Sequence, residues 1–567
     1  MSRLAKLFVV GVPIALIAAG VAAPLGGQPA AAAQSAPTLE PAVDRIFARW
    51  TSTTPGCAVG VSVRGTPVLT KAYGMADLEH DVPNTPDTIF EAGSVSKQFT
   101  AAAVLLLARD GKLSLDDPVR KYIPELPDYG RPLLIRHMLT HSSGLRDWGN
   151  VAAIGGWPRT SRVYTHAHVL EIVSHQRSLN FSPGDHYSYS NTGYNLAAVI
   201  VSRVSGMSFA DFTRTRIFEP LGMARTSWRD DYARIVKGRA MSYNAEADGF
   251  RTVMPFENVH GNGGLLTTVG DLLKWNENFV KPKVGDAAML GEQQHTRALT
   301  NGRMQSYALG LEIGTRRGVR EVAHSGSTAG YRAHLARYPD AGVSVAVLCN
   351  ASSAAATAYL GSVAEVYLAD RLQPESARGT YTLSAQEADA LTGLYRNTET
   401  GAPAALTRGE PGLRLGPASL FATSATRVVT ATGTTLEWTG RDRVTVNDTE
   451  GNVDRLERVA AATPGAAQLA ELAGTYVSDE AEVTLIAAVD GSALVLKRRP
   501  DTVIRLTPLY ADAFTGSIGT VIFRREGGRV VSLSVVQDRV WDLRFTRRAD
   551  ALKPTLQQNS AHNSREW

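Results

Sequence analysis

The feature that most constrains the fold is a change in sequence pattern near residue 372. Before it, from about residue 40, helical periodicities alternate with strand-like runs, as in an α+β or α/β enzyme domain. After it, a polar connector leads into two segments of short alternating strands without a helix. At 567 residues the chain is too long for one ordinary domain, and its 44% hydrophobic content is sufficient for globular cores. We therefore expect one mixed domain followed by two smaller all-β domains.

The two β-rich segments resemble each other at their ends. The first opens with "LTGLYRN" and the second with "LAGTYVS", so Gly393 and Tyr395 correspond to Gly474 and Tyr476. Each closes with a strand that contains Leu and Arg, "DRLERV" or "DLRFTRR". Sheets of this size hide their edges best by closing on themselves. The sequence therefore predicts two small antiparallel β-barrels.

The domain boundaries follow from these patterns and from the composition of the connecting segments. The expected order is a signal peptide at 1–33, a mixed α+β domain at 34–372, a linker at 373–388, a first barrel at 389–460, a linker at 461–467, a second barrel at 468–548 and a polar tail at 549–567.

The N-terminal segment is typical of a secretory signal. Arg3 and Lys6 precede an apolar run, and a small-residue cleavage site ends at Ala33. We expect the mature protein to be secreted or periplasmic, with no stable membrane span after processing. An uncleaved anchor is the alternative, because the apolar run approaches the length that a bilayer requires.

Cysteine content and net charge narrow the possibilities further. Cys57 and Cys349 are the only cysteines, and each lies at an end of a strand-like run. If those strands are antiparallel neighbours, the two thiols can form one disulfide in an oxidising compartment, and two buried free thiols are the alternative. The net charge is only +5, without a block of Lys or Arg, which argues against a nucleic-acid partner.

Ser94 and Lys97 stand where an apolar helix begins, in the stretch "EAGSVSKQFTAAAVLLLARDGKLSLDD". Residues three apart share a helix face, so the hydroxyl and the amine are expected to meet. A serine becomes a good nucleophile when a neighbour takes its proton, and a lysine can do so once burial lowers its pKa. The helix N-terminus also offers free N–H groups to an oxyanion. The pair predicts a nucleophile and its base, with a lysine extended along a surface helix as the alternative.

Two further motifs follow in the same domain, Tyr189-Ser190-Asn191 and His324-Ser325-Gly326. With Ser-x-x-Lys, they occur in the order that marks the penicillin-recognising serine hydrolases, and the chain resembles that family over about residues 40 to 370. The family includes class C β-lactamases, D-alanyl-D-alanine carboxypeptidases, D-aminopeptidases and related esterases. The resemblance implies a β-lactamase-like α+β domain, with an antiparallel sheet flanked by helices and an all-helical region.

The resemblance also assigns catalytic roles. Ser94 would attack the carbonyl and form an acyl-enzyme, and Lys97 would accept its proton. Tyr189 would relay a proton to the leaving amine, as a phenol whose pKa is depressed by the nearby ammonium. The backbone N–H groups of Ser94 and Ser327 would form the oxyanion hole. Neither a metal nor a cofactor is required.

The remaining motif residues are assigned to substrate binding by the same resemblance. Asn191 would hold the substrate amide, and His324 and Gly326 would line the opposite side of the cleft. His324 replaces a lysine of many relatives, so a group that titrates near pH 6.5 stands where an ammonium stays charged. This departure means that β-lactamase activity does not follow from the motifs.

Three functions are compatible with the sequence. The combination with two barrels resembles D-aminopeptidases and predicts a secreted serine hydrolase that cleaves a peptide or amide bond next to a D-amino acid, as a D-aminopeptidase or a D-alanyl-D-alanine carboxypeptidase does. An esterase or β-lactamase on the same scaffold is the first alternative. A non-enzymatic penicillin-binding or cell-wall-binding protein is the second.

The expected substrate is a small peptide or peptide derivative, but its polarity is open. A carboxypeptidase needs a cation for the free carboxylate, whereas an aminopeptidase needs an acceptor for the free amine. Glu312, Arg316, Arg317 and Arg320 lie on a predicted hairpin that ends at His324, mostly near its solvated tip. Neither polarity follows from them, and the oligomeric state is equally open.

Overall fold

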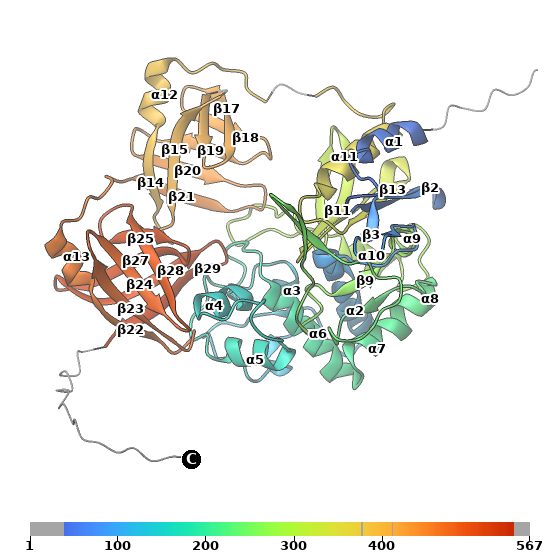
Figure 1. Cartoon of the computed structure of the whole chain (residues 1–567), viewed down its shortest axis with the longest axis horizontal. Helices are drawn as coiled ribbons and strands as arrows, with labels where there is room; N and C mark the ends of the chain where they lie inside the picture. Colours follow the sequence, from blue (N-terminus) through green and yellow to red (C-terminus); the bar gives the residue numbers. More distant parts are fainter. Residues whose placement is uncertain (1–38, 376–377, 411, 549–567) are drawn as a thin grey trace, which may run out of the picture. The chain divides into compact units, whose positions relative to one another are not determined.

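The computed structural model describes residues 39–375, 378–410 and 412–548 (Figure 1). The predicted signal peptide with its cleavage site at Ala33, and the predicted polar tail, lie outside these ranges. No single helix in the described part of the chain is long and apolar enough to cross a membrane; one bent pair of helices, Asn191–Ser205 with Phe209–Leu221, passes by length and composition alone.

A six-stranded sheet forms the centre of the first domain. Every pair of neighbouring strands is antiparallel, which confirms the sheet expected from the sequence. Its spatial order is β10 (Glu312–Arg316), β11 (Val319–Thr328), β12 (Tyr331–Tyr338), β13 (Val343–Cys349), β1 (Cys57–Val63) and β2 (Thr66–Tyr73).

Helices cover both faces of this sheet (Figure 1). On one face, α1 (Glu40–Phe47) and α11 (Ala356–Tyr367) bury Phe47 and Leu360 in one cluster with Val345 of the sheet. On the other face lies α9 (Val269–Asn278), and β1 carries Gly60 where an added Cβ would lie 3.2 Å from the Cβ of Val269. The sheet is therefore the middle layer of an α/β/α arrangement.

The long helix α2 (Lys97–Arg109) is the centre of the largest hydrophobic cluster. All its residues from Lys97 to Leu107 are buried, as expected for a helix that is apolar all round. It packs against α6 (Asn191–Ser205) in the helical region. The other helical segments of this domain are Gly93–Ser96 (η1), Val119–Lys121 (η2), Ile135–Leu139 (α3), Trp148–Ile154 (α4), His166–Ser174 (α5), Phe209–Thr213 (α7), Arg214–Phe218 (η3), Glu219–Leu221 (α8), Ala287–Gln293 (α10) and Pro339–Ala341 (η4).

Three minor sheets complete the first domain. One has three strands and lies next to η1, and the other two are two-stranded. Their strands are Phe90–Glu91 (β5), Leu265–Thr267 (β9) and Ser227–Trp228 (β6), then Met75–Asp77 (β3) with Val82–Pro83 (β4), and Tyr243–Glu246 (β7) with Gly249–Thr252 (β8).

Cys57 and Cys349 lie opposite each other on the paired strands β1 and β13. Both side chains are fully buried, and a disulfide joins them with an S–S distance of 2.11 Å. The bond links positions that are 292 residues apart in sequence. It therefore ties the first strand of the domain to the last strand of the sheet.

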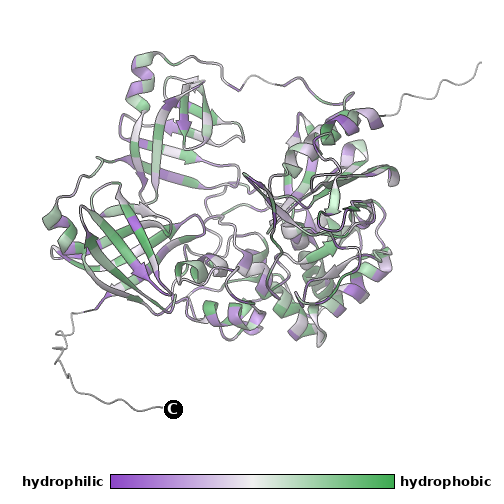
Figure 2. Ribbon diagram, viewed as in Figure 1, coloured by the Kyte–Doolittle hydropathy of each residue, from purple (hydrophilic) through white to green (hydrophobic). Residues whose placement is uncertain are grey.

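Two closed eight-stranded barrels follow, as the sequence predicts. The interior of the second is apolar, and Figure 2 shows mostly hydrophobic residues along several of its strands. The strands of the first are Gly393–Asn397 (β14), Pro403–Gly409 (β15), Gly412–Leu415 (β16), Ala418–Ser424 (β17), Arg427–Thr430 (β18), Thr435–Trp438 (β19), Arg443–Asn447 (β20) and Val453–Arg458 (β21). Those of the second are Gly474–Ser478 (β22), Val483–Asp490 (β23), Ala493–Arg498 (β24), Thr502–Pro508 (β25), Ala513–Gly516 (β26), Gly519–Glu526 (β27), Arg529–Gln537 (β28) and Val540–Arg547 (β29).

The repeated opening motif closes the first barrel at one end. The hydroxyl of Tyr395 donates to the carbonyl oxygen of Leu391 at 3.0 Å, and the guanidinium of Arg458 lies 4.7 Å from the centre of the tyrosine ring. Gly393 leaves room for this arginine, since an added Cβ would lie 2.3 Å from its Nη1. The glycine and tyrosine of the first strand and the arginine of the last strand therefore form one clamp.

The second barrel repeats this clamp with its own residues. Tyr476 donates to the carbonyl oxygen of Leu472 at 2.8 Å, and Arg547 lies 6.0 Å from its ring centre. An added Cβ at Gly474 would lie 2.8 Å from Nε of Arg547. The similarity seen in the sequence thus has the same structural cause in both barrels.

A helix precedes each barrel, although the sequence predicted none there. These are α12 (Ala385–Leu391) and α13 (Ala466–Leu472), and each buries its last leucine against its barrel. Ser384 begins α12 with a capping box in which Glu387 bonds back to the backbone of Ser384. Seven residues give too short a periodic signal to be separated from the surrounding strands.

Turns of both barrels contact the first domain, and the chain from Glu40 onward forms one compact unit. In the β20–β21 turn, Asn452 accepts from the backbone N–H of Tyr187 at 2.8 Å and donates to its carbonyl at 3.0 Å. In the second barrel, Glu480 lies 3.1 Å from the buried guanidinium of Arg146. The barrels are therefore attached next to the segment that leads into α6.

Opening the disulfide is expected to lower the free energy of unfolding by about 2–5 kcal/mol, because the bond restricts a long segment of the unfolded chain. Urea unfolding with and without a reductant measures this change. The variant C57A/C349A is the matched control, since it contains no cysteine and should not respond to the reductant. Alkylation of both thiols shows that the reductant has opened the disulfide. If the native protein then unfolds at the same urea concentration with and without the reductant, the prediction is contradicted.

Candidate active site

Ser94 lies in the first turn of the helical segment that continues into α2. Gly93 precedes it with φ of 51°, a value that favours glycine, and an added Cβ would lie 2.6 Å from the backbone nitrogen of Ser327. The start of η1 is thereby packed directly against β11. The close packing brings Ser94 of the Ser-x-x-Lys motif next to β11, the strand that carries His324-Ser325-Gly326.

Lys97 follows one turn later and is completely buried. Its Nζ lies 3.1 Å from Oγ of Ser94, 3.0 Å from Oδ1 of Asn191 and 2.8 Å from the carbonyl oxygen of Asn262. The last two atoms can only accept hydrogen bonds, so they take two N–H groups of the amine. A neutral lysine has two N–H groups and one lone pair. The lone pair is therefore left for the hydroxyl proton of Ser94.

The surroundings of Lys97 favour this neutral form. Burial lowers the pKa of Lys97 well below its usual value, and the positive charge of Arg539 lowers it further. Asp147 acts in the opposite direction, and Arg159 lowers the pKa slightly. The sequence prediction that a buried lysine serves as the base of Ser94 is thus supported by the contacts of its amine.

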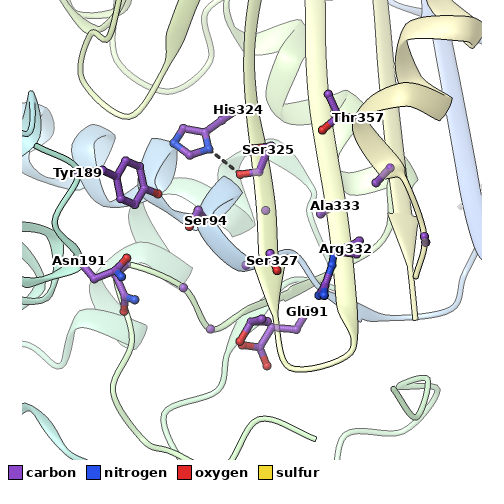
Figure 3. Close-up of a pocket in the computed structure, with 18 of the residues that line it drawn as sticks. Glu91, Ser94, Tyr189, Asn191, His324, Ser325, Ser327, Arg332, Ala333 and Thr357 are labelled. Atoms are coloured by element: carbon purple, nitrogen blue, oxygen red, sulfur yellow. Dashed lines mark hydrogen bonds between the residues drawn. The ribbon is translucent and has the colours of Figure 1, made fainter. Parts of the chain in front are cut away.

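Tyr189 lies beside the amine, in the segment just before α6. The Nζ of Lys97 is 4.8 Å from the centre of its ring, and Figure 3 shows Tyr189, Ser94 and His324 around one space. Burial raises the pKa of Tyr189 above its usual value, whereas hydrogen bonding with Ser94 and the charge of Arg539 lower it. Burial thus opposes the depressed pKa that the sequence led us to expect for Tyr189. Tyr189 is a protonated phenol.

Asn191 is the first residue of α6 and joins Lys97 to Asp147. Its Oδ1 accepts from Lys97, and its Nδ2 donates to Oδ2 of Asp147 at 2.8 Å. Asp147 is the N-cap of α4 and also accepts from the backbone of Gly149 and Asn150. Both polar atoms of the Asn191 side chain, which the sequence assigned to substrate binding, are thus hydrogen-bonded within the protein, to Lys97 and to Asp147.

His324 lies on β11 and makes two hydrogen bonds within the protein. Its Nδ1 donates to the carbonyl of Ser325 at 2.6 Å, so Nε2 accepts from the hydroxyl of Tyr307 at 2.8 Å (Figure 3 shows the first bond). Burial lowers the pKa of His324 to about 3. The titration near pH 6.5 expected from the sequence is therefore suppressed. His324 is neutral at physiological pH.

Gly326 allows β11 to run against the start of η1. An added Cβ would lie 2.0 Å from the carbonyl oxygen of Ala92 and 3.2 Å from the backbone nitrogen of Ser94. Ser94 and Ser327 both line the same cleft, and Ser94 lies in a first helical turn, where N–H groups have no helical acceptor. The two residues whose N–H groups the sequence assigns to the oxyanion hole thus line the same cleft.

His141 and Tyr307 also belong to this site. A histidine before Ser142-Ser143-Gly144 is more often a structural hydrogen-bonding residue than a catalytic one, and no motif indicated Tyr307. Nδ1 of His141 accepts from the backbone N–H of Ser190 at 3.1 Å, and its ring lies 4.1 Å from that of Tyr189 and 4.6 Å from that of Tyr307. Burial lowers the pKa of His141 well below its usual value. The rings of His141 and Tyr307 thus pack around Tyr189.

The cleft around these residues has a volume of about 900 Å³. It contains buried charges that are already paired. Glu91 accepts from Arg229 at 2.9 Å, and Glu257 accepts from Arg159 at 2.8 Å. Glu312 also lines the cleft, where desolvation raises its pKa to about 7, and it forms no ion pair with any described residue. The site thus has a polar wall with one unpaired carboxyl group.

The described residues contain one group of side chains with metal-ligand spacing, Asp77, Glu79 and His80, and the last two are exposed. None of the three lines the cleft.

Sequence motifs did not indicate three contributors to the site, and only two of them left a signal. Asp147 precedes a helix, as N-cap residues do, and Asn262 lies in the glycine-rich stretch "GNGGLL". Arg539 also lines the cleft, but it comes from a turn of the second barrel. Its backbone carbonyl accepts a hydrogen bond from Asn180, which lies 359 residues away in the sequence. A local sequence pattern does not predict a contact over that separation.

Comparison with known proteins agrees with this geometry. Residues 42–366 match the family model described as Beta-lactamase. The chain is 29% identical over 534 residues to a D-aminopeptidase of Gluconobacter oxydans, which covers 90% of this chain and 98% of that protein. It is 29% identical over 285 residues to penicillin-binding protein 4* of Bacillus subtilis, which covers 47% of this chain and 62% of that protein.

Solved structures show the same fold. An octameric penicillin-binding protein homologue from Pyrococcus abyssi superposes with a TM-score of 0.52 at 24% identity, over 74% of this chain and 99% of that one. The D-amino acid amidase of Ochrobactrum anthropi SV3 superposes with a TM-score of 0.51 at 24% identity, over 59% and 99%. The resemblance inferred from the three motifs is confirmed: this chain belongs to the beta-lactamase family and is a serine hydrolase.

Proposed function

We propose that the protein is an exported hydrolase that cleaves an amide or peptide bond next to a D-amino acid through an acyl-enzyme at Ser94. The observation that carries the proposal is the coordination of Lys97. Two acceptors occupy its N–H groups, and its lone pair is left for the serine proton. The names of the similar D-aminopeptidase and D-amino acid amidase support the D-configured substrate. The N-terminal signal sequence supports export.

The proposed reaction has two halves. Oγ of Ser94 attacks the carbonyl carbon while its proton moves to Nζ of Lys97, and the N–H groups of Ser94 and Ser327 stabilise the oxyanion. The phenol of Tyr189 donates its proton to the leaving nitrogen and regains one from Lys97. The C–N bond breaks, the amine leaves and Ser94 carries the acyl group. Water then attacks this ester, and the acid and the free serine are released.

His324 acts in this scheme as a positioning residue rather than as a proton donor. Both of its ring nitrogens are hydrogen-bonded, and its partner Tyr307 packs against His141. Its neutral ring therefore fixes the aromatic group around Tyr189 without adding a charge to the cleft.

Replacing Ser94 by Ala is expected to reduce amide hydrolysis by about 10⁴-fold or more, because the nucleophile is removed. Release of p-nitroaniline from D-alanine p-nitroanilide and N-acetyl-D-alanine p-nitroanilide, each beside its L-enantiomer, measures this loss and the preference for D-substrates. Ser174→Ala, at the end of α5, is the control and should keep full activity. Hydrolysis of esters or cephalosporins alone, or equal rates for both enantiomers, would replace the proposed substrate class by the esterase or β-lactamase alternative.

Acylation is expected to fall as the pH decreases through the lowered pKa of Lys97, because the ammonium form has no lone pair for the serine proton. A profile of kcat/KM against pH should therefore show one acidic limb below the usual lysine range. His324→Gln should keep this limb, since His324 is neutral above its pKa of about 3. A limb near pH 6.5 that disappears in this variant would contradict the assignment of the base.

A further inference from the structure

One turn of the second barrel forms part of the wall of the active site. It joins β28 to β29 and brings Arg539 into the set of residues that line the cleft, together with Ser94 and Tyr189. The guanidinium of Arg539 lies 4.8 Å from the centre of the Tyr189 ring. A cation is thus placed on the face of the phenol that would protonate the leaving group.

The turn is fixed to the first domain by four hydrogen bonds. The carbonyl of Arg539 accepts from the backbone N–H of Asp147 at 3.3 Å and from Nδ2 of Asn180 at 3.2 Å. Oδ1 of Asn180 accepts from the backbone of Trp541 at 3.0 Å, and Asn150 donates to Gln537 at 2.7 Å. These bonds join the turn to the N-terminus of α4. Arg539 is therefore held in place by its own backbone, which leaves its side chain free to bind.

The charge of Arg539 is only loosely compensated. Its guanidinium lies 3.8 Å from Oδ2 of Asp147 and 4.0 Å from Asp538, and it donates no side-chain hydrogen bond to any described residue. Asp147 already accepts four hydrogen bonds, two from the start of α4 and two from Asn191. It has little capacity left for the arginine.

The other arginines of the cleft differ in this respect. Arg159 and Arg229 bond to buried carboxylates, and Arg316 bonds to Glu321 at 3.0 Å. Arg332 donates to backbone carbonyls, that of Ala329 among them. Among the described residues that line the cleft, Arg539 is therefore the arginine whose donors are unused.

We propose that Arg539 binds a carboxylate of the substrate on the leaving-group side, so that the enzyme releases a carboxyl-terminal residue from a peptide. This inference rests on the proposed function and specifies its substrate. A guanidinium presents paired N–H donors that match a carboxylate. In an amino-acid leaving group, the nitrogen and the carboxylate are attached to the same carbon. The group that protonates the nitrogen and the group that binds the carboxylate must then be neighbours, as Tyr189 and Arg539 are.

Glu312 represents the opposite polarity in the same cleft. Its unpaired carboxyl group would accept the free amine of an aminopeptidase substrate. Its backbone pairs with that of Tyr307, whereas the guanidinium of Arg539 lies over the ring of Tyr189 itself. The position of the arginine beside the proton donor is the reason to favour the carboxylate, and recognition of an amine by Glu312 is the competing outcome of the test.

The test compares N-acetyl-D-alanyl-D-alanine with its C-terminal amide, which lacks only the negative charge. We expect kcat/KM of the native enzyme to favour the acid by roughly 10- to 100-fold, mainly through KM. Arg539→Gln should abolish this ratio. Any effect of the variant on Lys97 cancels in the ratio, since both substrates use the same base. Arg544→Gln, a 70% exposed arginine on β29, is the matched control and should leave the ratio unchanged.

A binding experiment separates failure of this inference from failure of the proposed function. Calorimetry with the Ser94→Ala variant measures the affinity for the acid and for the amide without turnover. Tighter binding of the acid, lost when Arg539→Gln is added, supports the carboxylate site even if hydrolysis proceeds poorly. Equal affinities overturn it, and so does hydrolysis that requires a free amine and is lost in Glu312→Gln. Thermal unfolding of each variant shows that the fold is retained.

Discussion

The hydrogen-bonding pattern of the Lys97 amine is the constraint on which the rest of the site depends. Two oxygen acceptors, from Asn191 and Asn262, take N–H groups of the amine, and burial lowers its pKa well below the usual value. Each of these partners is fixed by a different part of the domain. Asn191 begins α6 and is held by Asp147, the N-cap of α4, so two helix termini determine the orientation of one lone pair. A substitution at Asn191, Asn262 or Asp147 would therefore change the orientation of the Lys97 amine relative to Ser94.

The barrels are best understood through their turns rather than through their interiors. Each is closed by the same clamp of glycine, tyrosine and arginine, which requires nothing from the first domain. The turns of the barrels, in contrast, contact the first domain. Asn452 bonds to the backbone two residues before Tyr189, and Arg539 packs on the ring of Tyr189 itself. Both barrels therefore contact the segment that carries Tyr189, the first at the backbone of Tyr187 and the second at the ring of Tyr189.

The sequence predicted the fold well where local pattern and spacing carry the information. The antiparallel sheet, the two barrels and the family were inferred correctly. Ser94, Tyr189 and His324 line one cleft, and the buried Lys97 bonds to Ser94. The protonation states were not predictable, because burial is a property of the assembled structure. It lowers the pKa values of Lys97 and His324 and raises that of Tyr189. The seven-residue helices before the barrels were missed because so short a segment shows no clear period.

The attachment of Arg539 has an evolutionary consequence. The catalytic residues are packed within the core of their domain, where a substitution disturbs several neighbours at once. The turn between β28 and β29 that carries the arginine contributes to the cleft, whereas the clamp of its barrel is built from Gly474, Tyr476 and Arg547. Substitutions in this turn can therefore alter the lining of the cleft without disturbing the buried residues around Lys97.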